Sequence, residues 1–116
     1  MTVDLPAITG ERMLGAWRET LPGLLQPGDG CEVHLDEADA NRKSLVIHID
    51  VAGHEMYSLD FRAEYVDDRE IKVELHDVQR GSQHIDERQD EVQELIKDYV
   101  RRIRQCVQQL HSLTHN

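Results

Sequence analysis

The stretch YSLDFRAEYVDDREIKVEL, residues 57–75, decides the fold of this chain. Apolar and polar side chains alternate on both sides of the central VDDRE, which is the period of a β-strand with one buried face. We expect two antiparallel strands joined by this polar turn, in a register that sets opposite charges against each other. The residues that face each other in this register are Ala63 and Val73, Arg62 and Glu74, and Glu64 and Lys72.

The same alternation occurs twice upstream, in residues 31–36 and 45–51. Four alternating segments joined by polar turns predict an antiparallel meander with one apolar and one polar face. We expect the second and third strands to pair through Ile49 and Leu59. We expect the first and second strands to pair through Leu35 and Ile47.

Two amphipathic helices flank the predicted sheet. Residues 9–20 repeat apolar side chains at helical spacing, with Thr9 as a suitable N-cap. Residues 86–113 carry a broader apolar stripe behind a capping-box pattern at Asp86–Gln89. We therefore expect a single α+β domain over residues 1–116. Its order is helix, four-stranded antiparallel meander and long C-terminal helix, with both helices on one face of the sheet in two layers.

The charge of the chain disfavours several classes of partner. The formal net charge is −10, whereas binding to phosphates rests on clustered Lys and Arg. We therefore expect neither a nucleic acid nor an anionic membrane surface as a partner. The sequence contains no signal-peptide pattern and no run of about 18 apolar residues, so we expect a cytoplasmic protein.

The two cysteines, Cys31 and Cys106, lie on predicted apolar faces and lack any metal-ligand spacing. We expect reduced, buried thiols, with a disulfide across the sheet–helix interface as the alternative. The sequence also lacks the glycine-rich, serine-hydrolase and zinc-protease motifs that mark common catalytic sites. These observations predict no cofactor.

One group of polar residues has the composition of a metal site. The three predicted registers place His34, His48, Asp60 and His76 in one row across the polar face. Neighbours in such a row stand roughly 4.5–5.5 Å apart at Cβ. Three imidazoles and a carboxylate suit zinc or iron(II), and they also suit a pH-sensitive patch. The alternative is an ordinary solvated sheet face.

The predicted C-terminal helix is longer than the sheet that it covers. A helix of about 28 residues is roughly 42 Å long, and strands of about eight residues span roughly 27 Å. We expect the first helix to cover part of the surplus apolar stripe and a second subunit to cover the rest. The predicted interface residues of this homodimer are Tyr99, Ile103, Cys106, Leu110 and Leu113.

The function predicted from these features is that of a small acidic binding or regulatory module. It would act through contacts with an unknown protein partner. In size, charge and α/β composition the chain is similar to small acidic cytosolic chaperones of secreted proteins, although no motif carries that likeness. The first alternative is a divalent-metal or acid–base enzyme that uses the histidine row. The second is a small-ligand carrier with a cavity near Trp17, Phe61 and Tyr99.

Overall fold

The computed structural model has the predicted α+β architecture. It describes residues 11–38, 44–53, 57–67, 70–81, 83–85 and 89–114, with the side chains of residues 83–84 and 112–114 outside this description. The elements in chain order are α1 (Glu11–Thr20), the 3-10 helix η1 (Leu21–Leu24), β1 (Gly30–Leu35), β2 (Ser44–Asp50), β3 (Tyr57–Tyr65), β4 (Ile71–Arg80), β5 (Gln83–His84) and α2 (Asp90–Thr114).

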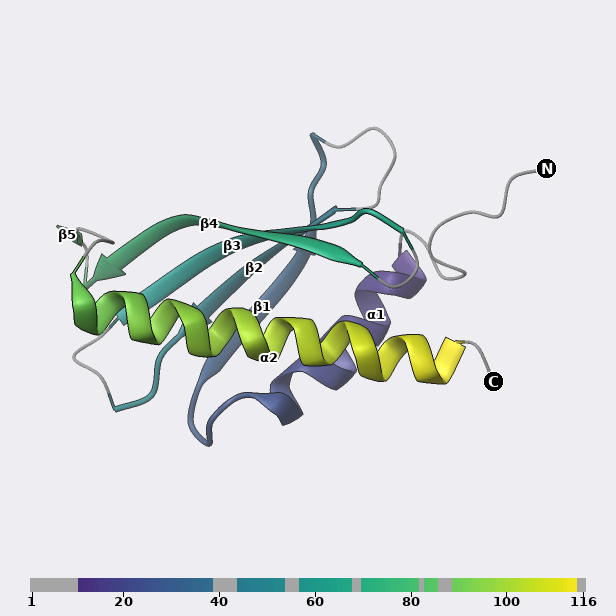
Figure 1. The fold of residues 1–116 in the computed structure, drawn as a ribbon, viewed down its shortest axis with the longest axis horizontal. Helices are drawn as coiled ribbons and strands as arrows, with labels where there is room; N and C mark the ends of the chain where they lie inside the picture. The colour runs from purple at the N-terminus through teal and green to yellow at the C-terminus, as the bar shows by residue number, and fades with distance from the viewer. Residues whose placement is uncertain are drawn as a thin grey trace.

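The strands form one antiparallel sheet in the order β1-β2-β3-β4-β5. Buried and partly exposed side chains alternate strictly along β3, which gives the sheet the predicted apolar face. Figure 1 shows α2 lying across the sheet with β4 along one side of the helix and α1 beside β1. Both helices contact the sheet and each other, so they form one layer over its apolar face.

The register of the hairpin formed by β3 and β4 is as predicted. Ala63 lies opposite Val73, with the two predicted opposite-charge positions on either side of that pair. The register of β2 and β3, through Ile49 and Leu59, is also confirmed. Beyond the hairpin, a β-bulge shifts the register between Asp60 and Phe61. The bulge inserts one residue of β4 that has no direct partner on β3.

The predicted register of β1 and β2 is wrong by two residues. Leu35 lies opposite Leu45, and Ile47 lies opposite Val33. A slip of two residues keeps every side chain on its own face, so the apolar pattern cannot distinguish the two registers. The observed register brings Asp36 within 2.7 Å of the Arg62 guanidinium on β3. That ion pair, with Arg62 also donating to the Ser44 hydroxyl, favours it.

The 3-10 helix η1 and the short strand β5 were not predicted, and the start of α2 differs from the predicted one. β5 follows a turn at Gly81, whose φ of 65° lies in the left-handed region that glycine tolerates. α2 begins at Asp90 rather than residue 86, and the backbone carbonyl of Gln89 accepts the N–H of Gln93 at its start. The predicted N-cap Thr9 and residues 86–88 of the predicted capping box lie outside the described residues.

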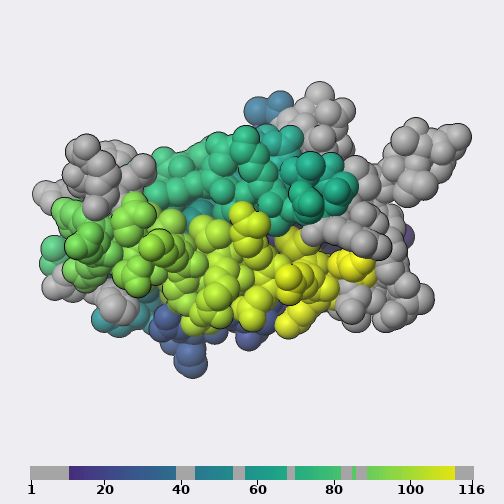
Figure 2. Space-filling view, viewed as in Figure 1, coloured from purple at the N-terminus to yellow at the C-terminus, as the bar shows by residue number. Residues whose placement is uncertain are grey.

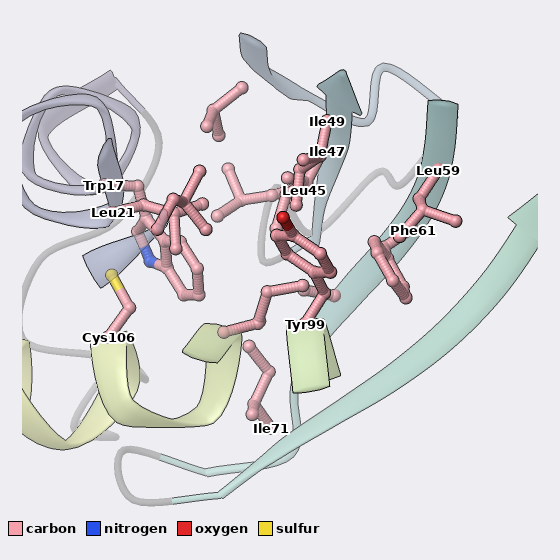
Figure 3. Close-up of a cluster of buried hydrophobic side chains, with 14 of the residues drawn as sticks. Trp17, Leu21, Leu45, Ile47, Ile49, Leu59, Phe61, Ile71, Tyr99 and Cys106 are labelled. Carbon is pink, nitrogen blue, oxygen red and sulfur yellow. The ribbon is translucent and has the colours of Figure 1, made fainter. Parts of the chain in front are cut away.

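The core lies between the sheet and the two helices. Figure 3 shows side chains from the helical layer meeting those of the central strands in one cluster. The Trp17 indole N–H donates to the Tyr65 hydroxyl at 3.0 Å, which satisfies a polar atom that burial would otherwise leave without a partner. The labelled residues of this cluster are Trp17, Leu21, Leu45, Ile47, Ile49, Leu59, Phe61, Ile71, Tyr99 and Cys106.

Candidate functional site

The structure brings together only one pair from the predicted histidine row. His48 and Asp60 lie opposite each other on β2 and β3, with His48 Nδ1 2.6 Å from Asp60 Oδ1. His34 lies opposite Val46 instead, because of the two-residue difference in register. His76 occupies the bulge, and its neighbour in the sequence takes the place opposite Asp60.

The predicted four-residue metal set is therefore not assembled on the polar face. Within residues 11–114, leaving aside the undescribed gaps, no group of three or more His, Cys, Asp or Glu side chains could hold a metal ion. The physical reason is cumulative: the row needed three correct registers, and only that of β2 and β3 holds at the positions concerned. The sequence pattern fixed the face of each residue but not its place along the strand.

His48 instead belongs to a cluster that includes Asp50 and Ser58, which were not among the predicted site residues. Its second ring nitrogen, Nε2, lies 3.1 Å from Asp50 Oδ1, and the Ser58 hydroxyl donates to that same oxygen at 3.0 Å. Asp50 is two residues from His48 on the same face of β2. The register predicted for β2 and β3 already set Asp50 opposite Ser58, so this signal was present in the sequence.

The electrostatics of this cluster favour a charged imidazole. Burial alone would lower the pKa of His48, but the hydrogen bonds and negative charges of Asp60 and Asp50 outweigh it and raise the pKa above the ordinary 6.5. In the charged form both ring nitrogens donate to carboxylates. The ring then has no free nitrogen to take a proton from a substrate, so the arrangement suits a structural tie across the strands better than acid–base catalysis.

The predicted interface residues are core residues. Tyr99, Ile103 and Cys106 are 0% exposed in the single chain, and Leu110 is 5% exposed. These four side chains are already covered within the single chain, because α1 packs against α2 and covers the end that the sheet does not reach. The role of these residues in an interface stays a prediction. The side chain of Leu113 lies outside the described residues.

Tyr99 takes part in a tie between distant parts of the chain. Its hydroxyl donates to Asp29 Oδ2 at 2.6 Å, and Asp29 also accepts the backbone N–H groups of Gln26 and Ala52, at 2.9 and 2.7 Å. Burial, followed by the hydrogen bond to Asp29, raises the pKa of Tyr99. One carboxylate thus joins the turn before β1, the end of β2 and the middle of α2.

The two cysteines are free thiols of low reactivity. Burial, with smaller contributions from Asp29 and Glu32, raises the pKa of Cys31 to about 11. Burial likewise raises the pKa of Cys106 to about 12. Because the thiolate is the reactive form, neither thiol is suited to nucleophilic catalysis near neutral pH.

The positions proposed for a ligand cavity are filled by the core. Trp17, Phe61 and Tyr99 are all 0% exposed and belong to the same packed cluster. A hollow of about 540 Å³ lies elsewhere, on the outer face of α2. It is lined by Ile96, Lys97, Val100, Arg101, Arg104, Gln105 and Gln108.

The helix that carries this hollow contacts β4, which has an open outer edge. β5 pairs only with Gln79 and Arg80, so no described strand pairs with the outer side of residues 71–77 of β4. Figure 2 shows β4 directly beside α2 on the face turned to the viewer. We call this region the β4–α2 side: residues 70–77 with the residues that line the hollow on α2.

Apolar and charged side chains are both accessible on the β4–α2 side. Val73 and Leu75 of β4, and Ile96 and Val100 of α2, pack against the core but are only partly buried. Lys97 and Arg101 extend beside them and form ion pairs with Glu94 and Asp98 on the same helix. A group of accessible apolar side chains rimmed by polar ones is one of the features that mark a binding surface.

No protein-family model matches the chain, and neither the curated proteins nor the solved structures contain a significant match. The helices of the described part of the chain include none that is long and apolar enough to cross a membrane.

Proposed function

We propose that the protein is a protein-interaction module that binds a polypeptide along its β4–α2 side. The observation that carries the proposal is the open edge of β4. Five consecutive residues, 71–75, pair with β3 on one side and with no described strand on the other. An open edge offers backbone donors and acceptors to an added strand, which is a common mode of peptide recognition.

The flank of α2 supports the same proposal. A strand added to β4 would lie beside Ile96 and Val100, so that its apolar side chains could cover both. Backbone hydrogen bonds would then supply the alignment and the hollow on α2 would supply side-chain contacts. The exposed Arg104, for which the described residues provide no ion pair, favours an acidic side chain on the bound segment.

The alternative function, a metal-dependent or acid–base enzyme on the polar face, has less support. His34 and His76 lie away from His48, and both ring nitrogens of His48 are engaged by carboxylates. The contacts of His48 with Asp60 and of Asp50 with Ser58 join β2 to β3, and this structural role explains the cluster without a catalytic one.

Site-specific photo-crosslinking in the cell tests the proposal. A photoreactive amino acid replaces Lys97 on the β4–α2 side or, as the matched control, Arg12 on the exposed face of α1. We expect covalent adducts with a polypeptide at position 97 but not at position 12. We also expect the adducts to disappear when Val100→Glu places a charge on the apolar floor. Equal adducts at both positions, or adducts unaffected by Val100→Glu in a folded protein, would contradict the proposal.

A further inference from the structure

We infer that the occupant of the β4 edge is the β4 strand of a second copy of this chain. The two strands would run antiparallel about a two-fold axis at Val73 and join the two sheets into one. The inference rests on the proposed function, because it names what binds on the β4–α2 side. It places the dimer contact on a different surface from the buried stripe of α2.

The backbone of β4 is oriented for such a pairing. At the β3–β4 turn, the Val66 N–H donates to the Glu70 carbonyl at 2.9 Å, so residue 70 faces β3. Backbone groups alternate along an antiparallel ladder, and those of Ile71, Val73 and Leu75 therefore point away from β3. The open stretch ends at Val78, whose carbonyl accepts the N–H of Ile85 at 3.0 Å.

These outward groups restrict the registers of a symmetric pair. In an antiparallel ladder, the outward-facing residues of one strand form hydrogen-bonded pairs with the outward-facing residues of the other. Centring the axis on Val73 pairs Val73 with its own copy and Ile71 with Leu75 of the second copy. All three outward residues of each strand then exchange backbone hydrogen bonds, and the bulge lies beyond them.

The charges on the polar face select this register among its neighbours. Glu70, Lys72, Glu74 and His76 alternate on that face. With the axis at Val73, Lys72 lies opposite Glu74 of the second copy, twice in each dimer, and Glu70 approaches His76. An axis at Lys72 would set lysine against lysine, and an axis at Glu74 would set glutamate against glutamate.

The apolar face of the edge is complementary in the same register. Val73 and Leu75 are partly exposed in the single chain, although they belong to the apolar face. A second copy covers both, because Val73 meets Val73 and Leu75 meets Ile71. A two-fold axis perpendicular to the sheet also places both α2 helices on the same side of the joined sheet, where each faces the partly buried Ile96 and Val100 of the other. Covering apolar surface in this way is the general driving force of association.

A charge-exchange experiment tests both the occupant and the register. We expect the wild-type protein to have twice the mass of the 13.4 kDa chain by sedimentation equilibrium. Lys72→Glu and Glu74→Lys each place two like-charge pairs at the joint, and each should raise the dissociation constant of the dimer by roughly tenfold or more. At protein concentrations between the dissociation constant of the wild type and that of the variant, each single variant should be monomeric and the wild type dimeric.

Mixing the two single variants in equal amounts should restore the dimer, because every Glu then lies opposite a Lys. The double variant Lys72→Glu/Glu74→Lys, in which the two charges exchange places, should also be dimeric. Among the described residues, Lys72 and Glu74 form an ion pair with each other, at 3.3 Å and on an exposed surface. Each exchange also sets a like charge opposite Glu64 or Arg62 on β3, which costs little at exposed positions, so circular dichroism should show that every variant remains folded.

The outcomes separate this inference from the proposed function. Single variants that remain dimeric, or a mixture that stays monomeric, would overturn the Val73-centred pairing. A monomeric wild-type protein would overturn the second copy as occupant. If site-specific adducts with another polypeptide were still found at position 97, the proposed function would stand without it.

Discussion

The two edges of the sheet, β1 and β4, differ in whether other parts of the chain bind their outward backbone groups. At the β1 edge, the Arg18 guanidinium on α1 donates from Nε to the outward carbonyl of Val33 at 2.9 Å, and α1 packs beside the strand. At the β4 edge, α2 also lies beside the strand, but no described side chain donates to an outward backbone carbonyl of residues 71–75. Proteins generally protect exposed edges against pairing with other chains. The difference shows that a side chain of α1 occupies a backbone acceptor at one edge, whereas the outward backbone groups of residues 71–75 at the other edge have no described partner.

The largest change in the free energy of unfolding is expected at Asp29, which joins the turn before β1 to β2 and α2. Asp29→Ala removes the acceptor of three hydrogen bonds, one from Tyr99 and two from backbone N–H groups. Donors left without partners in a partly buried site should lower the free energy of unfolding by about 3 kcal/mol. Urea denaturation measures this loss. Tyr99→Phe, which removes only one of the three bonds, is the matched control and should cost about 1 kcal/mol.

Proline can show which backbone groups of β4 face outward. The N–H of Val73 points away from β3, whereas that of Lys72 belongs to the ladder with β3. In the monomeric chain, Lys72→Pro should therefore lower the free energy of unfolding by roughly 2 kcal/mol more than Val73→Pro, because it alone removes a hydrogen bond of the ladder with β3. Urea denaturation of the two variants provides the comparison. Equal losses would mean that the Val73 N–H is already used inside the fold.

Removing the Arg18 guanidinium should leave the β1 edge, like the β4 edge, with an outward backbone carbonyl that no side chain binds. Arg18→Met keeps much of the apolar stem of the side chain but leaves the Val33 carbonyl without its donor. We expect a loss of about 1 kcal/mol in the free energy of unfolding and a new tendency to form assemblies larger than those of the wild type. Light scattering measures the assemblies, and the exposed Arg12→Met serves as the control. A variant with unchanged stability and size would show that Arg18 does not protect this edge.

The smallest effect is expected on the polar face between the edges. The folded-state pKa of His48 is raised, so its charged form stabilises the fold below the unfolded-state pKa of about 6.5. This contribution should disappear as the pH rises through the folded-state pKa. Because the side chain is one-third exposed, we expect less than about 1 kcal/mol. His48→Gln should remove this part of the pH dependence in urea denaturation, whereas the more exposed His34→Gln should leave it in place.

The part of the fold predicted from the sequence is the part set by local patterns. Period-2 alternation located the four main strands, and opposite charges at Arg62 and Glu74 gave the correct register of β3 and β4. Arg62 nevertheless forms its ion pairs with Glu64 on the same strand and with Asp36, which lies at a strand end whose position was predicted wrongly. Alternation defines the face of a residue, and contacts between distant segments define its position along the strand.

The candidate sites were harder to predict for the same reason. The histidine row depended on positions along three strands, and a two-residue slip with one bulge dispersed it. The apolar stripe of α2 was correctly recognised, but amphipathicity does not say whether the covering surface belongs to the same chain. Asp29 lies in a glycine- and proline-rich turn, and nothing in that local sequence identifies Tyr99, 70 residues away, as its partner.

The buried contact between Trp17 and Tyr65 makes the protein its own spectroscopic reporter. Trp17 is the single tryptophan of the chain, and its ring meets that of Tyr65 edge to face at a centroid distance of 6.4 Å. Its side chain is 0% exposed where α1, the sheet and α2 meet. Its fluorescence emission should therefore lie at short wavelength in the native protein and move to longer wavelength when α1 separates from the sheet. A red shift that precedes the loss of β-sheet circular dichroism during unfolding would show that the cover of the β1 edge detaches before the sheet itself opens.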